Sequence, residues 1–306
     1  MKIYLLSPVA SQMFSSEMIS ELKNVGEVII DSVIKPISEV EAITNSDDKI
    51  IALDPDFCAW NLPKEELEKI NGLKALCVQS TSFSWLDTEY LKSKNIPVIN
   101  IRNYSTDSVA EWAVMMAMNV ARKLPLIIKN NWLGDFSLHQ GMELKGKVVG
   151  IIGLGHIGTR IAEICQGMGM KVVYWSKNSV ASQYQKVELT DLFKNADLIF
   201  PCLAQNEETK NYITDEMLNS MKNKAIFISI VHKIYNHDLL LQLAKENKIY
   251  GYAFETPNQE MLNYEGNVWA GPEQAWNTKE SLGRNLKIWQ ENIIKAAQNN
   301  FEFRVN

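Results

Sequence analysis

The sequence has 306 residues, of which 46% are hydrophobic and 22% charged, and its formal net charge is -5. At about 150 residues per domain, this length predicts two globular domains and excludes a single small module. Because the balance is acidic and Lys and Arg form no run, the composition argues against a nucleic-acid or anionic-membrane partner. The longest apolar stretch, 109–124, is shorter than the roughly 20 residues that cross a bilayer, so we expect no transmembrane helix.

Short apolar runs alternate with helical segments through the first hundred residues, a pattern typical of a parallel sheet. Strands are expected at 3–6, 28–30, 50–53, 75–78 and 97–99. Helices are expected near 18–22, 65–70 and 86–91. This part of the chain is therefore predicted to form a five-stranded α/β unit.

A long helix is predicted next. Ser108-Val-Ala-Glu111 matches a capping box, in which a hydroxyl and a carboxylate bind free amides at a helix start, so the helix is expected to begin at Ser108 and to reach Leu124. The segment is apolar on nearly every side. We expect it to be buried between domains or between subunits.

A second alternating series follows. Strands are expected near 148–152, 171–175, 198–200, 225–229, 249–253 and 267–269. The tail from Leu282 reads as a helix, with Leu286, Trp289 and Ile293 on one face, and is expected to return to the first domain. The predicted class is α/β, with two doubly wound parallel-sheet domains, 1–102 plus 275–306 and 103–274.

The cysteines are Cys58, Cys77, Cys165 and Cys202, and no two of them form a Cys-x-x-Cys pair. This spacing supports neither a zinc site nor a disulfide framework, so we predict reduced thiols and no bound metal. The amino terminus has too short an apolar run for a signal peptide. A cytoplasmic location is therefore expected.

The strongest chemical signal is Gly153-Leu-Gly155-His156-Ile157-Gly158, between a predicted strand and a predicted helix. In this context the glycines let the backbone approach a pyrophosphate at the helix amino end. We therefore predict a dinucleotide site. The alternative is an incidental glycine-rich turn.

The choice of dinucleotide is expected to depend on Ser176-Lys177-Asn178, at the end of the second strand of this domain. A carboxylate here would accept the ribose hydroxyls of NAD, whereas a hydroxyl, a cation and an amide favour the 2′-phosphate of NADP. NADP(H) is therefore the favoured cofactor, and a solvated loop that tolerates NAD(H) as well is the alternative. Pro201, which follows the next buried strand, is expected to border the same site.

Three stretches carry a family resemblance: Ser108 to Glu111, Leu144 to Gly158, and Asn267 to Pro272 with Ala275-Trp276 behind it. Together they resemble the D-2-hydroxyacid dehydrogenase family over nearly the whole chain. The resemblance implies a flavodoxin-like substrate domain, a Rossmann domain and a cleft between them. It also implies a homodimer built around the long helix, and hydride transfer between a nicotinamide and a small 2-oxo or 2-hydroxy acid.

The resemblance also implies an arginine that clamps the substrate, a histidine that donates a proton and a glutamate that tunes the histidine. The sequence departs from this set. Around 229–233, where the arginine belongs, it has His232 and Lys233, and the residue after Pro272 is Glu273 in place of the histidine. Glu260 lies about where the glutamate belongs.

The substituted residues have two interpretations each. Glu273 is either a replacement acid, provided that burial near Trp276 raises its pKa, or an inert substitution. His232 and Lys233 either supply positive charge to a substrate anion or lie in a surface turn; neither reproduces the fork of a guanidinium. His139 and His237 are expected to cap or to face solvent.

Ser80-Thr81-Ser82, after the fourth strand, matches the family loop whose backbone amides hold the substrate carboxylate, and such a turn is where ligands of α/β sheets bind. Phe83 and Trp85 either shape a pocket there or pack beneath a helix. Three functions remain open. The first is an NADP-dependent oxidoreductase whose altered cleft acts on a carbonyl or related group different from an ordinary 2-oxo acid. The second is an ordinary 2-hydroxyacid dehydrogenase with a substituted catalytic set, and the third is a cofactor-binding protein of this fold without dehydrogenase turnover.

Overall fold

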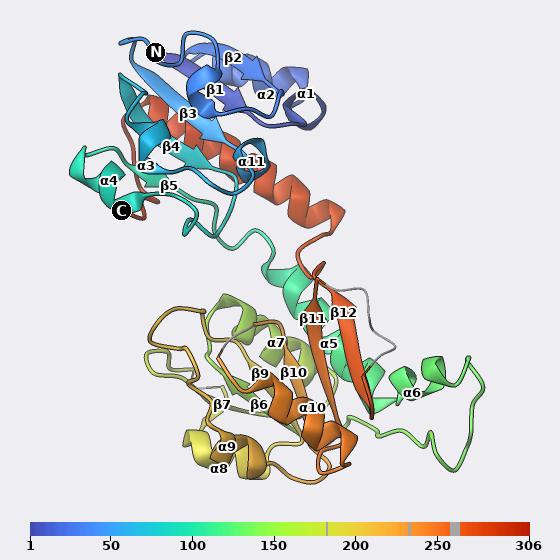
Figure 1. Cartoon of the computed structure of the whole chain (residues 1–306). Coiled ribbons are helices and arrows are strands. Elements are labelled where there is room, and N and C mark those ends of the chain that lie inside the picture. Colours follow the sequence, from blue (N-terminus) through green and yellow to red (C-terminus); the bar gives the residue numbers. More distant parts are fainter. Residues whose placement is uncertain (182, 232–233, 258–263) are drawn as a thin grey trace. The chain divides into compact units, whose positions relative to one another are not determined.

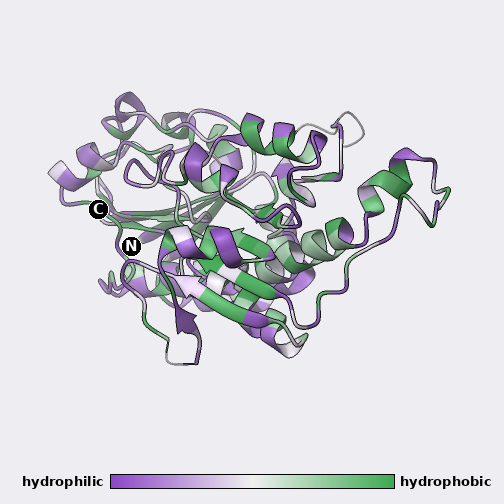
Figure 2. Cartoon of the chain, turned by 90° about the horizontal axis from the view of Figure 1, so that it is seen from below, coloured by the Kyte–Doolittle hydropathy of each residue, from purple (hydrophilic) through white to green (hydrophobic). Residues whose placement is uncertain are grey.

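The computed structural model describes residues 1–181, 183–231, 234–257 and 264–306. The chain forms two compact units (Figure 1): unit 1 comprises Met1–Tyr104 and Lys279–Asn306, and unit 2 comprises Ser105–Thr278. Each unit has one parallel sheet with an apolar layer on both faces. The strands carry mostly hydrophobic residues, whereas the helices alternate hydrophobic and hydrophilic ones (Figure 2). The predicted α/β class with two parallel-sheet domains is confirmed.

Unit 1 contains the five strands that the sequence predicts. They are β1 (Lys2–Leu6), β2 (Glu27–Asp31), β3 (Lys49–Leu53), β4 (Leu73–Val78) and β5 (Val98–Ile99). Their order in the sheet is β2-β1-β3-β4-β5, and every pair is parallel. The carboxyl ends of all five therefore lie along one edge.

The helices of unit 1 connect these strands, and the tail of the chain adds the longest one. They are α1 (Ala10–Met13), α2 (Ser16–Lys23), η1 (Ile37–Glu39), η2 (Pro55–Cys58), α3 (Lys64–Leu67), α4 (Thr88–Ser93) and α11 (Lys279–Ala297). In α11, Trp289 and Ile293 are fully buried in the core of unit 1, and the Trp289 indole donates to the Cys77 carbonyl at 2.9 Å. The expected return of the tail to the first domain is confirmed.

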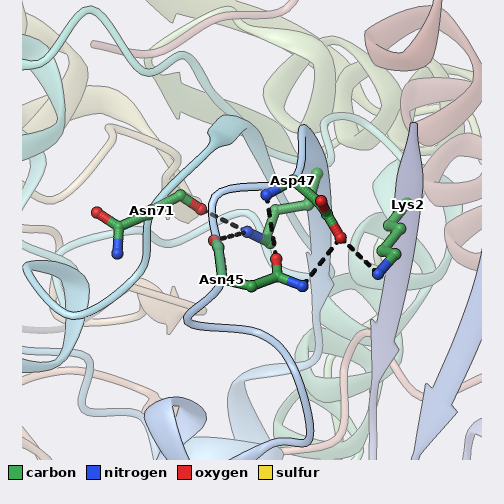
Figure 3. A network of polar contacts seen from close by, with 5 residues as sticks. Lys2, Asn45, Asp47 and Asn71 are labelled. Carbon is green, nitrogen blue, oxygen red and sulfur yellow. Dashed lines mark hydrogen bonds and ion pairs between the residues drawn. The ribbon is translucent and has the colours of Figure 1, made fainter.

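A lysine holds the amino-terminal edge of this sheet (Figure 3). Lys49 is fully buried, and its Nζ donates to the carbonyls of Asn45 and Asn71, so one cation binds two loops. Burial lowers the pKa of Lys49. Beside it, the exposed pair Lys2–Asp47 has a 2.6 Å Nζ–Oδ2 distance, and Asn45 also donates to Asp47.

Lys49→Met is expected to lower the free energy of unfolding by about 2 kcal/mol, because two buried carbonyls lose a charged donor. Chemical denaturation of the variant measures this change. Lys2→Met is the matched control, and loss of its exposed ion pair is expected to cost less than about 1 kcal/mol. Equal losses in the two variants would contradict the assigned role of Lys49.

Unit 2 has a seven-stranded sheet. Its strands are β6 (Val148–Ile152), β7 (Lys171–Trp175), β8 (Gln185–Lys186), β9 (Leu198–Pro201), β10 (Ile226–Ser229), β11 (Gly251–Thr256) and β12 (Val268–Pro272). The order is β12-β11-β10-β9-β6-β7-β8, again all parallel. The sequence analysis missed β8, because its two exposed polar residues carry no apolar pattern. It also ended β11 at residue 253, whereas the strand continues to Thr256.

The helices of unit 2 are α5 (Thr106–Ala121), α6 (Leu124–Lys129), α7 (His156–Gly167), α8 (Leu189–Asn195), α9 (Asp215–Asn219) and α10 (His237–Lys245). The predicted start of the long helix at Ser108 is wrong. The helix begins at Thr106, and the Ser108 hydroxyl lies 3.0 Å from the Thr278 hydroxyl. The predicted end at Leu124 is also wrong, because Pro125 has no amide to bond back and Lys123 is left-handed, with φ +53°.

Helix α5 packs against α7, β10 and β11 and buries Ala113, Met116 and Val120, so much of its apolar surface belongs to the core of unit 2. After it, α6 and the following loop project from the body of unit 2 (Figure 1). Within the described ranges, no helix is long and apolar enough to span a bilayer.

Candidate active site

The carboxyl edge of the sheet in unit 2 collects most of the residues of interest. The strand order reverses between β6 and β9, where Ile152 pairs with Pro201. The Gly153 amide donates to the Trp175 carbonyl at 2.8 Å, which holds the turn after β6 beside the end of β7. In doubly wound sheets, ligands bind outside the carboxyl ends at such a reversal.

The three glycines of the turn have different environments. Gly153 has φ +97°, a left-handed conformation that favours glycine. A Cβ on Gly158 would lie 2.2 Å from the Gly153 carbonyl oxygen, so α7 can pack this closely only without a side chain. A Cβ on Gly155 would meet no atom of the described part of the chain within 4 Å. The fold therefore requires the first and third glycines, whereas the second one leaves space above the backbone.

The amino terminus of α7 opens onto that space. Gly155 is its N-cap, no side-chain hydrogen bond from the described residues caps it, and the first turn has no acidic residue. His156 and Ile157 are the first two residues of this 12-residue helix. The amino end of a helix carries partial positive charge and attracts anions. The open cradle at Gly155 and this uncapped end together fit a dinucleotide pyrophosphate.

A lysine in the loop after β7 lies close to a carboxylate from a distant part of the chain. Ser176 is buried and accepts from the Ser179 amide, whereas Lys177 and Asn178 are exposed. Lys177 Nζ lies 3.7 Å from the carboxylate of Glu208. The sequence analysis missed this acidic neighbour, because Glu208 comes from the loop after β9.

That second loop is held by its own contacts. The Thr209 hydroxyl donates to the Ala204 carbonyl at 2.7 Å, and the Tyr212 ring contacts the ring of Trp175 at the end of β7. Trp175 directly precedes Ser176. The aromatic contact therefore joins the two loops that carry Lys177 and Glu208.

Glu255, near the end of β11, is the other residue that the sequence analysis missed. It is only 8% exposed, and its Oε1 accepts the amides of Gln274 and Ala275, each at 3.0 Å. Burial raises the pKa of Glu255 to about 7, and the nearby carboxylate of Glu273 adds to this shift. Near neutral pH this carboxyl can therefore hold or release a proton.

Glu273 has a different environment from the one that its proposed acid role needs. The residue is exposed, and Trp276, which was expected to bury it, is 44% exposed. The burial expected for Glu273 is found at Glu255, whose strand position pairs with Gly271. His232, Lys233 and Glu260 lie outside the described residues.

The loop after β4 in unit 1 is tightly bonded. The buried Ser80 hydroxyl donates to the Ser82 carbonyl at 2.6 Å, and Asn100 donates to the Thr81 carbonyl at 2.7 Å. Phe83 and Trp85 are partly buried against the core of unit 1, as the packing interpretation expects.

The two histidines outside the family pattern both have polar contacts. His139 Nδ1 accepts the Asp135 amide at 3.0 Å, so this histidine closes a turn. His237 lies 2.8 Å from the hydroxyl of Tyr252, a contact that the sequence analysis did not anticipate.

Comparison with known proteins gives a consistent result. Residues 114–276 match the family model of the D-isomer specific 2-hydroxyacid dehydrogenase, NAD binding domain. A protein of Staphylococcus aureus (strain USA300) named "Putative 2-hydroxyacid dehydrogenase" is 29% identical over 259 residues, which cover 78% of this chain and 80% of the relative.

Solved structures agree with this match over both units. An acyclic imino acid reductase in complex with NADPH and D-Arg has a TM-score of 0.81 and 25% identity, with 100% of both chains covered. A D-lactate dehydrogenase with NAD+ from Lactobacillus jensenii has a TM-score of 0.79 and 23% identity, also with 100% of both chains covered, which is a likeness of fold.

The family match spans just over half of the chain, lies within unit 2 and includes the glycine turn and α7. The chain therefore belongs to the D-isomer-specific 2-hydroxyacid dehydrogenases, a family of oxidoreductases that bind a nicotinamide dinucleotide.

Proposed function

We propose that this chain is an NADP(H)-preferring oxidoreductase that transfers a hydride to the carbonyl-type carbon of a small organic acid with an altered catalytic set. Unit 2 binds the dinucleotide, and unit 1 contributes to substrate binding through Ser80, Thr81 and Ser82. The observation that carries the proposal is the glycine turn, in which Gly155 leaves an open cradle at an uncapped helix. A fluorescence titration with NADPH tests it.

The residues that hold the dinucleotide are those of the turn and the adjoining loops. The amides at the start of α7, with His156 and Ile157, bind the pyrophosphate, and Pro201 borders it from β9. When bound, the nicotinamide supplies the hydride. The protein's own contribution is to fix the turn and to exclude water from the buried carboxyl ends of β6 and β9.

Lys177 is proposed to select the 2′-phosphate of NADPH, aided by Ser176 and Asn178. Lys177→Ala is therefore expected to weaken NADPH binding about tenfold and NADH binding less than about twofold, because only NADPH carries the extra charge. Parallel titrations at low salt measure this ratio, since screening weakens exposed charges. Equal effects on both cofactors would refute the role.

Glu208→Gln is the matched control for this prediction. It removes the carboxylate 3.7 Å from Lys177, so NADPH binding is expected to strengthen about threefold, while NADH binding does not strengthen. A loss of NADPH affinity in this variant would contradict the assigned roles of both residues.

Proton transfer is proposed to rest on Glu255. Reduction of a carbonyl by hydride leaves an oxygen that needs a proton, and Glu255 is a buried carboxyl whose pKa of about 7 suits that task. The amides of Gln274 and Ala275 fix its Oε1. Glu273 then acts through its charge, by raising the pKa of its neighbour. His232, Lys233 and Glu260 remain candidate contacts to the substrate.

A carbon–nitrogen double bond is a second candidate acceptor of the hydride. The solved structure of an imino acid reductase, 25% identical to this chain, contains NADPH and D-Arg, the latter an amino acid. The negative charge of Glu273, joined by that of Glu255 only when its carboxyl is ionised, favours a cationic imine over an anionic 2-oxo acid. Comparison of 2-oxo acids with and without an added amine distinguishes the two acceptors.

A homodimer is also proposed, and it involves the projecting loop after α6 as well as the long helix α5. Trp132, Leu133, Phe136 and Leu138 are all exposed in that loop, and Met118 is exposed on α5. Apolar residues this concentrated favour a second copy of the chain. Light scattering measures the oligomeric state.

A cytoplasmic location is also proposed, because the four cysteines form no disulfide and thiols stay reduced in the cytosol.

The alternative function is cofactor binding without turnover. It is favoured by the sequence around 229–233, which has no arginine to clamp a substrate carboxylate. Tight NADPH binding, with no oxidation by any carbonyl or imine substrate, would support this function over a reductase.

A further inference from the structure

Arg102, one of the five arginines in the chain, lies at the carboxyl edge of the sheet in unit 1. It follows β5 and is exposed, and its Nε donates to the side-chain oxygen of Asn100 at 3.0 Å. No carboxylate of the described residues forms an ion pair with Arg102, whereas Arg160 pairs with Asp107 and Glu163. The terminal nitrogens of the Arg102 guanidinium are therefore available to an anion from outside the protein.

A buried amide holds Arg102 in place. Asn100 is only 4% exposed, and its Nδ2 donates to the Thr81 carbonyl at 2.7 Å while its Oδ1 accepts from Arg102. The Asn100 carbonyl in turn accepts from the buried side chain of Asn292 at 3.1 Å. The guanidinium is a planar fork of donors, and its Nε hydrogen is already used. Nη1 and Nη2 remain as a pair of donors whose geometry matches the two oxygens of a carboxylate.

The loop after β4 adds a second set of donors. It lies beside the end of β5, because β4 pairs with β5 and the Asn100 side chain bonds to the Thr81 carbonyl. Among the described residues, the amides of Thr81 and Ser82 find no acceptor. The loop and the Arg102 guanidinium are thus bonded to the two sides of one amide group. Successive backbone amides and a nearby cation together favour an anion.

A carboxylate is the anion that suits this arrangement. Nη1 and Nη2 can each bind one of its oxygens, and a backbone amide can donate to either oxygen as well. The carboxyl edge of a parallel sheet is also where α/β units bind ligands. Around 229–233, the chain has no arginine for this purpose. Both candidate hydride acceptors, a 2-oxo acid and an imino acid, carry a carboxylate that needs such a partner.

We propose that Arg102, held by Asn100, binds the carboxylate of the substrate together with the amides of Thr81 and Ser82. The substrate class is then a small organic acid whose carboxylate is bound by unit 1, whether its reacting group is a carbonyl or an imine. The catalytic meaning of this contact rests on the proposed oxidoreductase function. The binding of a carboxylate at this edge of unit 1 does not depend on that function.

The first test is calorimetric titration of the full chain with oxamate, an unreactive analogue of a 2-oxo acid, with and without NADPH. In Arg102→Met, the oxamate affinity is expected to fall at least about tenfold, because the carboxylate loses a charged partner that binds both of its oxygens. Arg102→Lys keeps the charge without the fork, so its affinity is expected to lie between the two. Equal affinities of the wild type and Arg102→Met would overturn the proposal, as would a wild type that binds oxamate under neither condition.

Arg304→Met is the matched control. Arg304 is also an exposed arginine of unit 1, and its Nε donates to the Asn306 carbonyl. Its removal changes the net charge by the same amount, yet the oxamate affinity is expected to stay within about twofold of the wild type, because salt screens a charge that does not contact the anion. A comparable loss in both variants would show that only the total charge matters and would contradict a specific role of Arg102.

Nitrogen-15 NMR of the labelled protein locates the bound anion. Oxamate at the concentration that half-saturates the wild type is expected to shift the amide signals of Thr81 and Ser82, and to shift them much less in Arg102→Met. Shifts confined to unit 2 would place the carboxylate elsewhere and refute the proposal.

Activity gives a third measurement that separates substrate binding from a structural effect. In Arg102→Met, kcat/KM for acid substrates is expected to fall at least about tenfold, while kcat/KM for an aldehyde without a carboxylate changes less than about twofold. An equal loss for both kinds of substrate would indicate a structural defect and contradict the binding role. If the wild type shows no turnover with any substrate, the proposed function fails, whereas the oxamate titration and the NMR measurement still decide this inference.

Discussion

Gly155→Asp is expected to reduce NADPH and NADH affinity by at least about a hundredfold while the protein stays folded. A Cβ added at Gly155 meets no atom of the described residues within 4 Å, and the φ of -84° suits any residue. Aspartate is also a good N-cap, so it would satisfy the amides of α7 and place a negative charge where the pyrophosphate binds. Fluorescence titration and thermal melting measure the two effects.

Two further glycine variants serve as controls. Gly155→Ala adds a methyl group in the same open space without charge, so its affinity is expected to lie between those of the wild type and the aspartate variant. Gly158→Ala is expected to destabilise unit 2, because its Cβ would lie 2.2 Å from the Gly153 carbonyl oxygen. Unchanged NADPH and NADH affinity in Gly155→Asp would refute the cofactor site.

Glu255→Gln is expected to lower kcat by about 10² to 10⁴, because a carboxamide cannot transfer a proton as a general acid. Gln274 and Ala275 can still donate to the amide oxygen, so the fold is retained. Steady-state kinetics with the best substrate of the wild type measure this loss. Glu273→Gln, at an exposed position, is the control and is expected to reduce kcat much less.

Glu255→Gln is also expected to change how the stability of the protein depends on pH. The pKa of Glu255 is raised from 4.5 to about 7 in the folded protein, so the folded state holds a proton that the unfolded state releases. Its contribution to stability is present below pH 4.5 and declines as the pH rises to about 7. Glu255→Gln lacks this decline.

Relative to the wild type, the glutamine variant should therefore gain on the order of 1–3 kcal/mol between pH 4.5 and pH 8. Denaturation across this range measures the difference. A constant difference would show that the carboxyl of Glu255 titrates normally.

Equal kcat losses in the Glu255 and Glu273 variants would contradict the assignment of the acid to Glu255 alone.

Features that depend on local sequence were predictable. Strands such as β6 and β7 match their predicted bounds, because a buried parallel strand is a short apolar run whose ends are marked by polar residues or glycine. The glycine turn was also predictable from local sequence. Its conformation at Gly153 and its close packing at Gly158 exclude other residues there, so the glycines themselves mark the turn.

Features that depend on contacts between distant residues were not predictable. Glu255 accepts hydrogen bonds from amides that come 19 and 20 residues later in the chain. Nothing in the sequence of the strand around Glu255 marks these contacts. Its only local signal is a carboxyl group at the end of an apolar strand. Glu208 likewise meets Lys177 across two loops, and the start of α5 depended on a choice among several polar residues before Ser108.

The most direct test of the central claim is a titration of the protein with NADPH and NADH, followed by assays of nicotinamide absorbance with a panel of 2-oxo acids, aldehydes and ketones. The 2-oxo acids are measured with and without an added amine. The account predicts tighter binding of NADPH and its oxidation by at least one member of the panel. Failure to bind either cofactor would contradict the account.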